Sequence, residues 1–277
     1  MRAPPDWHSL NQANWDERVP IHLNAPNAYG LTRLRAGTET LDPIAAEVLG
    51  SVDGLKVLHL QCHFGMDSLT IARDAASVTG VDFSPPAIAT ARSLATELGF
   101  ADRARFVEAN VYDALSALPE PGTFDRVFVS WGALCWLPDI AAWARIVAAF
   151  LAPGGFLALA EAHPIIYVFD DAAATADGRP GWYVPYFGRE PLLLENTEDY
   201  ADPTIRLRNR RTVEFLHPLS DIVTALLAAG LRIDRFQEHD NMVWKMFDCL
   251  VKRARDEYSW PDRPWLPLSF SLRAVKP

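Results

Sequence analysis

The sequence predicts an α/β fold, in which a mostly parallel sheet carries helices on both faces. From Leu55 onward, short apolar runs alternate with helical patterns at the spacing of strand–helix units. The predicted strands are KVLHLQ, SVTGVD, ARFVEA, DRVFVS and GFLALAEA, and helices are expected over residues 66–74, 86–98 and 140–151. Pro85 and Pro86 suit a helix start, whereas Gly99 and Gly154 follow helix ends. Such alternation implies right-handed crossovers and a covered sheet.

Two regions lie outside this alternation. Residues 1–50 read as an N-terminal helical cap segment, with helices near 11–18 and 38–49, ahead of a main domain over 51–277. Residues at about 162–212 form an insertion after the fifth strand, and a stretch this long is typical of a lid or binding loop. A helix at 220–229, the strand LRIDRF, a helix at 242–258 and the strand LSFSLRAV are expected to complete the chain.

The amino-acid composition disfavours several classes of function. The 26 basic and 35 acidic residues give a net charge of -9, and no basic run interleaves with aromatic residues, so nucleic-acid binding is disfavoured. Three scattered cysteines without metal-type spacing indicate a reducing compartment. The N-terminus has no apolar signal core and no stretch approaches a membrane span, so we expect a cytoplasmic protein without a membrane or metal partner. The sequence leaves the oligomeric state open.

The ends of the first two predicted strands carry residues suited to a nucleotide-like ligand. Gln61 ends the first strand and leads through Gly65 into a helix whose N-terminal amides can meet a negative group. Asp82 ends the second strand, where an acid can accept both hydroxyls of a ribose. Phe83 beside it can cover one face of an adenine. An Asp after a strand is as often a helix cap, so each signal alone is weak.

The remaining strand ends continue this series. At the third, the Asn110 amide and the Val111 N–H could contact an adenine edge. The fourth and fifth strands end at Ser130, Trp131 and Gly132 and at Glu161, Ala162 and His163. Ligands of parallel sheets bind beyond the carboxyl ends of the strands, so these residues should face one crevice.

Residues 55–162 resemble the class I S-adenosylmethionine-dependent methyltransferases. The motifs that carry the resemblance are VLHLQCHFG, VTGVDFS, VEANVYDAL, FDRVFVSWGALCWLPD and LAPGGFLALAEAHP, the last being the most specific. The resemblance implies a Rossmann-like, seven-stranded sheet with an antiparallel last strand, the cofactor S-adenosyl-L-methionine and a small-molecule methyl acceptor. WDERV near the N-terminus, with Tyr29, resembles a segment that closes over the cofactor in related enzymes.

The resemblance also implies site residues. Cofactor contacts are expected from Gln61, His63, Gly65, Asp82, Phe83, Asn110, Val111, Ser130 and Tyr29. Acceptor contacts are expected from Trp131, Trp136, Glu161, Trp182 and Tyr186, the last two in the insertion with Tyr183 and Phe187. His163 is a candidate general base or acceptor-orienting residue, or equally a structural histidine. Trp131 and Trp136 could be core aromatics, and Glu161 could instead pair with a backbone amide.

The first turn departs from the family pattern. His59 stands where an acidic residue is usual, and Gln61 and His63 occupy two of the three glycine positions, leaving Gly65. Glycine suits a positive φ or a close ligand approach. We therefore expect Gln61 and His63 to keep ordinary φ, with side chains that either point away or contact the cofactor by donating to its methionine carboxylate. Cys62 is expected to be buried and inert.

These features predict methyl transfer to a small, apolar or aromatic metabolite by in-line displacement, in which positioning and desolvation supply most of the acceleration. SWGAL after the fourth strand lacks the Asn/Asp-Pro-Pro-Tyr type of motif used on nucleic-acid bases. One alternative is a non-methylating protein of the same fold that binds the cofactor or a metabolite. A dehydrogenase is a weaker alternative, because a pyrophosphate loop needs more glycines.

Overall fold

The computed structural model describes residues 3–25, 30–255 and 257–277, and a seven-stranded sheet forms its centre. The strand order is β10-β14-β5-β4-β1-β2-β3. Its strands are β1 (Lys56–Leu60), β2 (Ser77–Asp82), β3 (Ala104–Glu108), β4 (Phe124–Ser130), β5 (Leu151–Ala162), β10 (Arg232–His239) and β14 (Ser269–Val275). Strands β3, β2, β1, β4 and β5 run parallel, whereas β14 is antiparallel to both β5 and β10. The predicted fold class is therefore confirmed.

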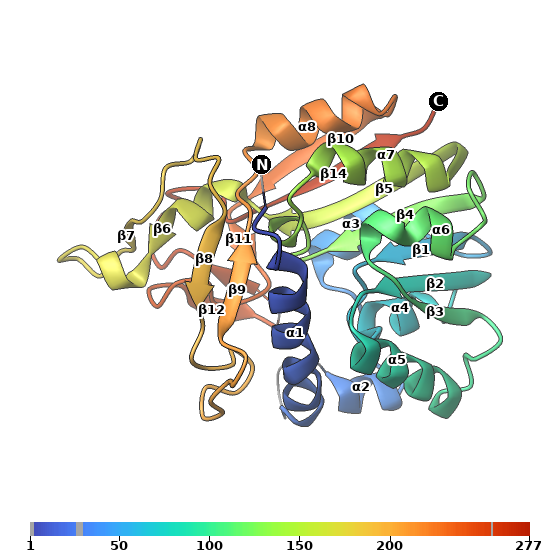
Figure 1. Cartoon of the computed structure of the whole chain (residues 1–277), viewed down its shortest axis with the longest axis horizontal. Coiled ribbons are helices and arrows are strands. Elements are labelled where there is room, and N and C mark those ends of the chain that lie inside the picture. The colour runs from blue at the N-terminus through green and yellow to red at the C-terminus, as the bar shows by residue number, and fades with distance from the viewer. Residues whose placement is uncertain (1–2, 26–29, 256) are drawn as a thin grey trace.

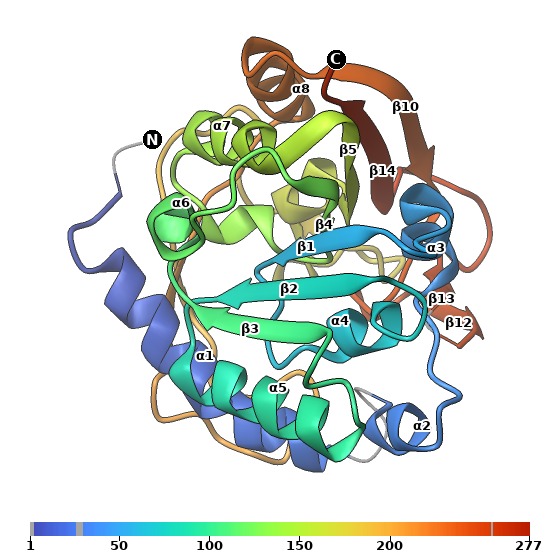
Figure 2. The ribbon, with the colours of Figure 1, turned by 90° about the vertical axis from the view of Figure 1, so that its right-hand side faces the viewer.

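Helices cover both faces of the sheet, as Figures 1 and 2 show. On one face lie α3 (Pro43–Leu49), α4 (Met66–Ile71) and α5 (Pro85–Glu97); on the other lie α6 (Ala114–Ala117), α7 (Ile140–Phe150) and α8 (Leu219–Ala228). Val57 faces the first set and Leu58 the second, and both are fully buried. Burial on both faces explains why the strands read as nearly continuous apolar runs.

Helix α1 (Trp7–Asn24) and the insertion stand beyond the carboxyl ends of the parallel strands. This helix lies between the sheet and the hairpin of β8 (Leu192–Glu195) and β9 (Arg211–Glu214), as Figure 1 shows. Helix α2 (Leu31–Arg35) follows. The insertion also holds β6 (Phe169–Asp170), β7 (Gly181–Trp182) and short 3-10 helices. The 3-10 helices among the described residues are η1 (Val111–Asp113), η2 (Leu134–Trp136), η3 (Pro164–Val168) and η4 (Asp171–Ala173).

Two sequence predictions need correction. The helix expected over 38–49 begins only at Pro43, because a residue before proline is disfavoured in the α region and Asp42 caps the Ile44 and Ala45 amides. The helix expected over 242–258 is absent from the described part of that segment. It forms a small sheet of β11 (Asn241–Met242), β12 (Val251–Ala254) and β13 (Glu257–Ser259).

The physical reason for the second error is packing. Val243, Met246, Phe247 and Leu250 recur at helical intervals, but the fold buries Phe247 and Leu250 in one cluster with Met242 and Trp260. The Phe247 and Trp260 rings stack at 5.9 Å. The helical spacing of apolar residues extends over too few residues to determine the secondary structure, and tertiary packing determines it instead. Among the described residues, no helix combines the length and apolar character that a membrane crossing would need.

Candidate cofactor and acceptor site

The first loop has the backbone shape of a glycine loop without its glycines. Gln61 and His63 have φ values of 58° and 49°, and Gly65, which caps α4, has a φ of 82°. The expectation that Gln61 and His63 keep ordinary φ is therefore wrong. A left-handed non-glycine residue costs roughly 1–2 kcal/mol, so the surrounding contacts must hold this shape.

Hydrogen bonds supply that restraint. The Cys62 N–H donates to the Val81 carbonyl at 3.0 Å, and the Gly65 N–H donates to the Cys62 carbonyl at 2.9 Å. The Gln61 Nε2 donates to the Ala133 carbonyl at 2.7 Å. The loop is thereby tied to β2 and to the turn after β4.

Close packing explains why Gly65 remains a glycine. A Cβ there would lie 2.8 Å from the Phe106 ring, and the positive φ already disfavours any side chain. Cys62 behind the loop is buried, and burial raises the pKa of its thiol well above the usual value. A thiol held protonated in this way is a poor nucleophile.

Asp82 lies at the carboxyl end of β2, directly beneath the first loop. Its Oδ2 accepts from the His63 N–H at 2.8 Å and its Oδ1 accepts from the Ser84 N–H at 3.0 Å. Burial raises the pKa of Asp82 to about 6, although these backbone amides oppose the shift. Each carboxylate oxygen keeps a further lone pair, so the group is oriented and can still accept two hydroxyls.

The neighbouring cofactor candidates lie along the same edge of the sheet. Phe83 is partly buried, its carbonyl accepts from Gln12 Nε2 at 2.7 Å, and its ring meets His8 edge-on at 5.4 Å. Asn110 caps η1, because its Oδ1 accepts from the Tyr112 N–H at 3.0 Å. Val111 begins η1 and is buried. Tyr29 lies outside the described residues.

Helix α1 covers the first loop. The Ser84 hydroxyl donates to Asp16 Oδ1 at 2.6 Å, and Trp15 packs edge-on against His63 at 5.3 Å. Between His22 Nδ1 and His63 Nε2 a hydrogen bond of 3.0 Å joins the helix to the loop. Burial lowers the pKa of both imidazoles, so this pair is neutral near pH 7.

Asp199 ties the same helix to the insertion. Its Oδ2 lies 2.8 Å from Arg18 NH1 and 3.1 Å from His22 Nε2, and all three side chains are buried. Because the Asp199 carboxylate accepts, His22 Nε2 carries the proton and His22 Nδ1 accepts from His63 Nε2. A chain of polar contacts therefore crosses from the insertion through α1 to the first loop.

The turn after β4 is organised by Glu161. The Glu161 carboxylate accepts from the backbone amides of Gly132, Ala133 and Leu134 at 2.5, 2.7 and 3.0 Å, and from Ala162 at 2.7 Å. Burial raises the pKa of Glu161 against these four amides. This geometry favours the structural alternative for Glu161 over acceptor binding.

The other residues at the end of β4 are also engaged with the protein. Ser130 Oγ donates to Asp67 at 3.1 Å. Trp131 has a φ of 47°, and its Nε1 donates to Asp42 at 2.6 Å. Trp136 is partly buried and meets Trp15 of α1 edge-on at 5.4 Å. Trp136 therefore lies on the crevice side, whereas Trp131 fits the core-aromatic alternative.

His163 caps η3. Its Nδ1 accepts from the Ile165 N–H at 3.1 Å, so the proton sits on Nε2, which donates to Glu238 Oε1 at 2.9 Å. Burial lowers the pKa of His163, although Glu238 opposes the shift. Both nitrogens are used within the fold, which favours the structural alternative for this residue.

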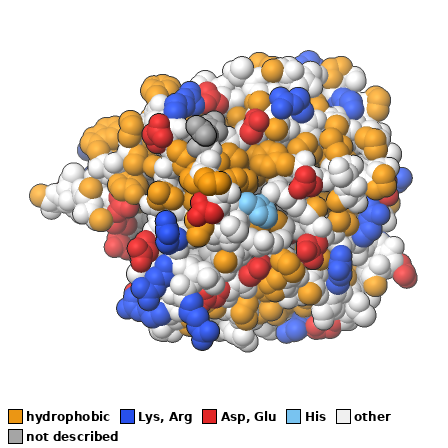
Figure 3. All heavy atoms as spheres, in the orientation of Figure 1, with side chains coloured by type: hydrophobic (Ala, Val, Ile, Leu, Met, Phe, Trp, Pro, Cys, Tyr) orange, Lys and Arg blue, Asp and Glu red, His pale blue; other side chains and the backbone are white. Residues whose placement is uncertain are grey.

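Two aromatic residues of the insertion that are expected on the acceptor side, Trp182 and Phe187, are largely exposed. Trp182 packs on Phe169 and is 75% exposed, and Phe187 is 71% exposed. They belong to the region that protrudes beside β6 and β7, where Figure 3 shows hydrophobic side chains. The Tyr186 hydroxyl accepts from the Leu219 N–H at 3.0 Å, which fixes it to α8.

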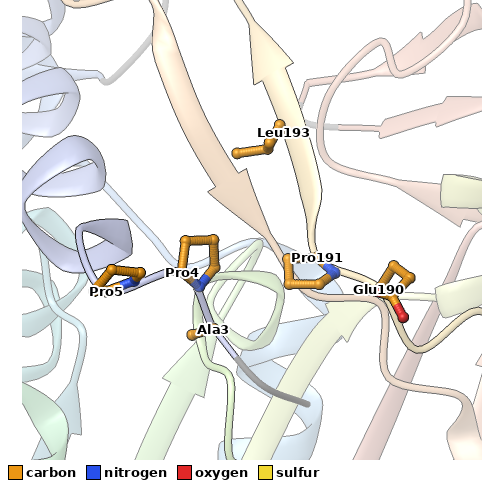
Figure 4. Close-up of a pocket in the computed structure, with 6 residues that line it drawn as sticks. All are labelled: Ala3, Pro4, Pro5, Glu190, Pro191 and Leu193. Atoms are coloured by element: carbon orange, nitrogen blue, oxygen red, sulfur yellow. The ribbon is translucent and has the colours of Figure 1, made fainter.

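A surface groove of about 440 Å³ also lies at the edge of the insertion. It is lined by Ala3, Pro4, Pro5, Glu190, Pro191 and Leu193, as Figure 4 shows. None of the predicted site residues belongs to this lining. Within the described ranges, no group of His, Cys, Asp or Glu side chains is arranged to hold a metal ion.

Sequence reasoning missed three polar residues of this region. Trp15 begins the motif WDERV, but His22, Asp199 and Glu214 had no motif or spacing to mark them. Their neighbours come from segments far apart in the chain, so only the tertiary fold brings them together. The spacing of apolar residues along a helix or strand does not show which distant residues become neighbours in the fold.

Known proteins resemble this chain in sequence. Residues 57–155 match the family described as "Methyltransferase domain". A ubiquinone biosynthesis O-methyltransferase of Xanthomonas euvesicatoria pv. vesicatoria is 30% identical over 197 residues, covering 70% of this chain and 71% of that protein. Its counterpart in Xanthomonas campestris pv. campestris is 32% identical over 164 residues, covering 58% and 61%. The match thus spans about three fifths of that relative's length.

A solved structure shows the same fold. The S-adenosylmethionine-dependent methyltransferase from Mesorhizobium loti superposes with a TM-score of 0.55 at 21% identity, over 91% of this chain and 100% of that one.

Proposed function

The chain belongs to the class I S-adenosylmethionine-dependent methyltransferases, whose cofactor is S-adenosyl-L-methionine, and on that premise we propose that it methylates a small, apolar or aromatic metabolite. The observation that carries the proposal is the Asp82 carboxylate, oriented by two backbone amides at the end of β2 beneath a left-handed loop. Family membership removes the dehydrogenase alternative.

The residues present fit the cofactor. Asp82 would accept the ribose hydroxyls, Phe83 would cover the adenine, and the Asn110 amide would contact its edge. The buried Gln61 Oε1 has no hydrogen-bond partner among the described residues, while Gln61 Nε2 is held by Ala133. An orphan acceptor calls for a donor, so we assign it to the ammonium of the methionine part rather than to the carboxylate.

When bound, S-adenosyl-L-methionine supplies a methyl group on a positively charged sulfur. The chain then has to hold the acceptor in line and exclude water. We propose that α1, through Trp15, His22 and its contacts with Asp199, closes the crevice. Trp15 and Trp136 offer an aromatic wall to the acceptor.

Supplying the full chain with methyl-labelled S-adenosyl-L-methionine and a panel of small aromatic hydroxyl and amine compounds tests this function. Labelled product and S-adenosylhomocysteine in equal amounts are expected. Cofactor binding without labelled product from the panel or from a metabolite extract would favour the alternative of a non-methylating protein of the same fold.

A further inference from the structure

Glu214 is an unassigned carboxylate at the inner end of the insertion. Its neighbours in sequence are firmly anchored: Val213 exchanges two hydrogen bonds of 2.8 Å with the Asn11 side chain of α1. The Phe215 N–H donates to the Cys135 carbonyl of η2 at 2.7 Å. Glu214 is therefore held between α1 and the segment that follows β4.

The carboxylate of Glu214 is partly buried and unusually poor in partners. No hydrogen bond reaches it from the described residues, in contrast to the four amides on Glu161. Its charged and titratable neighbours are Arg18 from α1, Cys135 from η2 and Tyr167 from η3. Glu161 of β5 also acts on Cys135 and Tyr167.

This environment sets the acidity of the group. Burial raises the pKa of Glu214 to about 7, although Arg18 opposes the shift. Carboxyl groups that stay unpaired and titrate near neutrality are suited to proton transfer. Glu161 accepts four hydrogen bonds and Glu214 accepts none from the described residues, so these two neighbouring carboxylates are suited to different roles.

The position of Glu214 separates it from the cofactor groups. Asp82 and Asn110 stand at the ends of β2 and β3, on one side of the central strand β1. Glu214 borders the segments that follow β4 and β5, on the other side of β1. Because the acceptor has to lie beside the cofactor, we expect the acceptor to bind beyond the carboxyl ends of β4 and β5.

Resting on the proposed function, we propose that Glu214 is the general base that takes the proton from a phenolic or similarly acidic hydroxyl of the acceptor. The acceptor O–H bond breaks and its proton passes to the Glu214 carboxylate. The oxygen forms a bond to the methyl carbon as the carbon–sulfur bond breaks, and that electron pair stays on sulfur. One negative charge on Glu214 and one positive charge on sulfur are thereby neutralised together.

The acceptor class follows from the match of acidities. A phenol such as that of tyrosine titrates near about 10, within reach of a base that titrates near neutrality. Aliphatic alcohols resemble water, which titrates near about 15.7, and would need a much stronger base. Glu214 acts electrostatically on Tyr167, and Trp136 follows Cys135, whose carbonyl accepts from the Phe215 N–H. Trp136 in turn contacts Trp15, and these aromatic side chains also favour an aromatic acceptor.

The test uses the full chain with S-adenosyl-L-methionine, and with catechol as the hydroxyl probe and benzylamine as the amine probe. For the wild type, kcat/KM for catechol should rise through roughly pH 7 to a plateau. Glu214→Gln should lower kcat at least about 100-fold and abolish this rise, with unchanged calorimetric affinity for S-adenosylhomocysteine as proof of folding. Glu195→Gln, an exposed position in the same hairpin, should behave as the wild type.

Three results would overturn the assignment of Glu214. The first is a Glu214→Gln variant that keeps wild-type turnover and the same pH profile. The second is a wild type that binds S-adenosylhomocysteine but does not methylate catechol. The third is preference for benzylamine, which would make Glu214 a cation receptor. A wild type that does not bind S-adenosylhomocysteine would instead contradict the proposed function itself.

Discussion

At the residue scale, the site depends on groups held in states that they avoid elsewhere. Gln61 and His63 adopt left-handed backbone conformations, and Asp82 and Glu214 are carboxyl groups that burial makes less acidic. Each costs stability and persists only because neighbouring contacts hold it. Such residues are expected where a ligand, rather than the fold alone, determines the geometry.

The titration of Asp82 predicts a pH-dependent cofactor affinity. A pKa raised to about 6 means that the carboxylate is ionised at pH 7 and mostly protonated at pH 5. Only the ionised form accepts two hydroxyls, so the dissociation constant of S-adenosylhomocysteine should be about tenfold higher at pH 5 than at pH 7.

Calorimetry at both pH values measures this change. Asp82→Asn should bind more weakly at pH 7 and show no such dependence, whereas Asp102→Asn in an exposed turn should match the wild type. Equal wild-type affinities at pH 5 and pH 7 would remove Asp82 from the ribose role.

The backbone of Gln61 predicts an inverted preference between glycine and alanine. Both Gln61→Gly and Gln61→Ala lose the hydrogen bond to Ala133, but only glycine relieves the positive φ. Gln61→Gly should therefore be more stable than Gln61→Ala by about 1 kcal/mol in urea unfolding.

Arg105 provides the control, because it is exposed in β3 with ordinary strand geometry. There the glycine variant should be less stable than the alanine variant by roughly 0.5–1 kcal/mol. The same order at Gln61 as at Arg105 would show that the first loop is not held in the left-handed form.

The ends of the strands explain which site residues could be predicted from sequence. The positions of Asp82 and Gly65 were predictable because a strand end and a helix start are each visible in the sequence, whereas their contacts with the cofactor stay a prediction. The conformation of Gln61 was not, because residue type argues against a positive φ. The partners of His163 and Glu161 arise from other strands and loops, so their structural engagement was not visible locally.

At the scale of elements, α1 is the piece that joins the cofactor side to the insertion. It contacts the first loop through His22 and Trp15, and the insertion through Asn11 and Arg18. We propose that residues 1–50 serve as a cap whose closure depends on the buried Arg18–Asp199 pair. Asp199 lies within the insertion, so that segment contributes a latch for the cap.

Removal of one partner tests this latch. Asp199→Asn removes the carboxylate that pairs directly with the buried Arg18 guanidinium, which keeps its hydrogen bond to Asn14, and losing one partner of a buried pair costs about 3–5 kcal/mol. We expect faster amide hydrogen exchange across α1, together with weaker binding of S-adenosylhomocysteine.

A neighbouring pair serves as the matched control. Glu198 and Arg206 form an exposed ion pair in the same insertion, so Glu198→Gln should change stability by less than about 1 kcal/mol and leave α1 exchange unaltered. Equal exchange in α1 for Asp199→Asn and the wild type would show that the pair does not hold the cap.

At the scale of the whole molecule, the alternation of strands and helices made the sheet predictable. Apolar runs such as SVTGVD are buried on both faces, and that pattern is characteristic of a covered parallel sheet. The segment around Met242 was misread because its apolar spacing resembles a helix while its packing partner, Trp260, lies farther along the chain. The insertion lacks a period of its own, and only its contacts with α1 give it a place in the fold.

The two halves of the sheet edge divide the work. We propose that the ends of β1, β2 and β3 hold the cofactor and that the acceptor lies beside the segments after β4 and β5, which border Glu214. This arrangement predicts that cofactor binding does not require Glu214, although methyl transfer does.

Calorimetric titration of the full chain with S-adenosylhomocysteine at pH 7 tests the central claim most directly. One molecule is expected to bind per chain, with an affinity that falls in Asp82→Asn and is unchanged in Glu214→Gln. Absence of binding to the wild type, or equal binding to wild type and Asp82→Asn, would contradict the proposal that this loop and this carboxylate form the cofactor site.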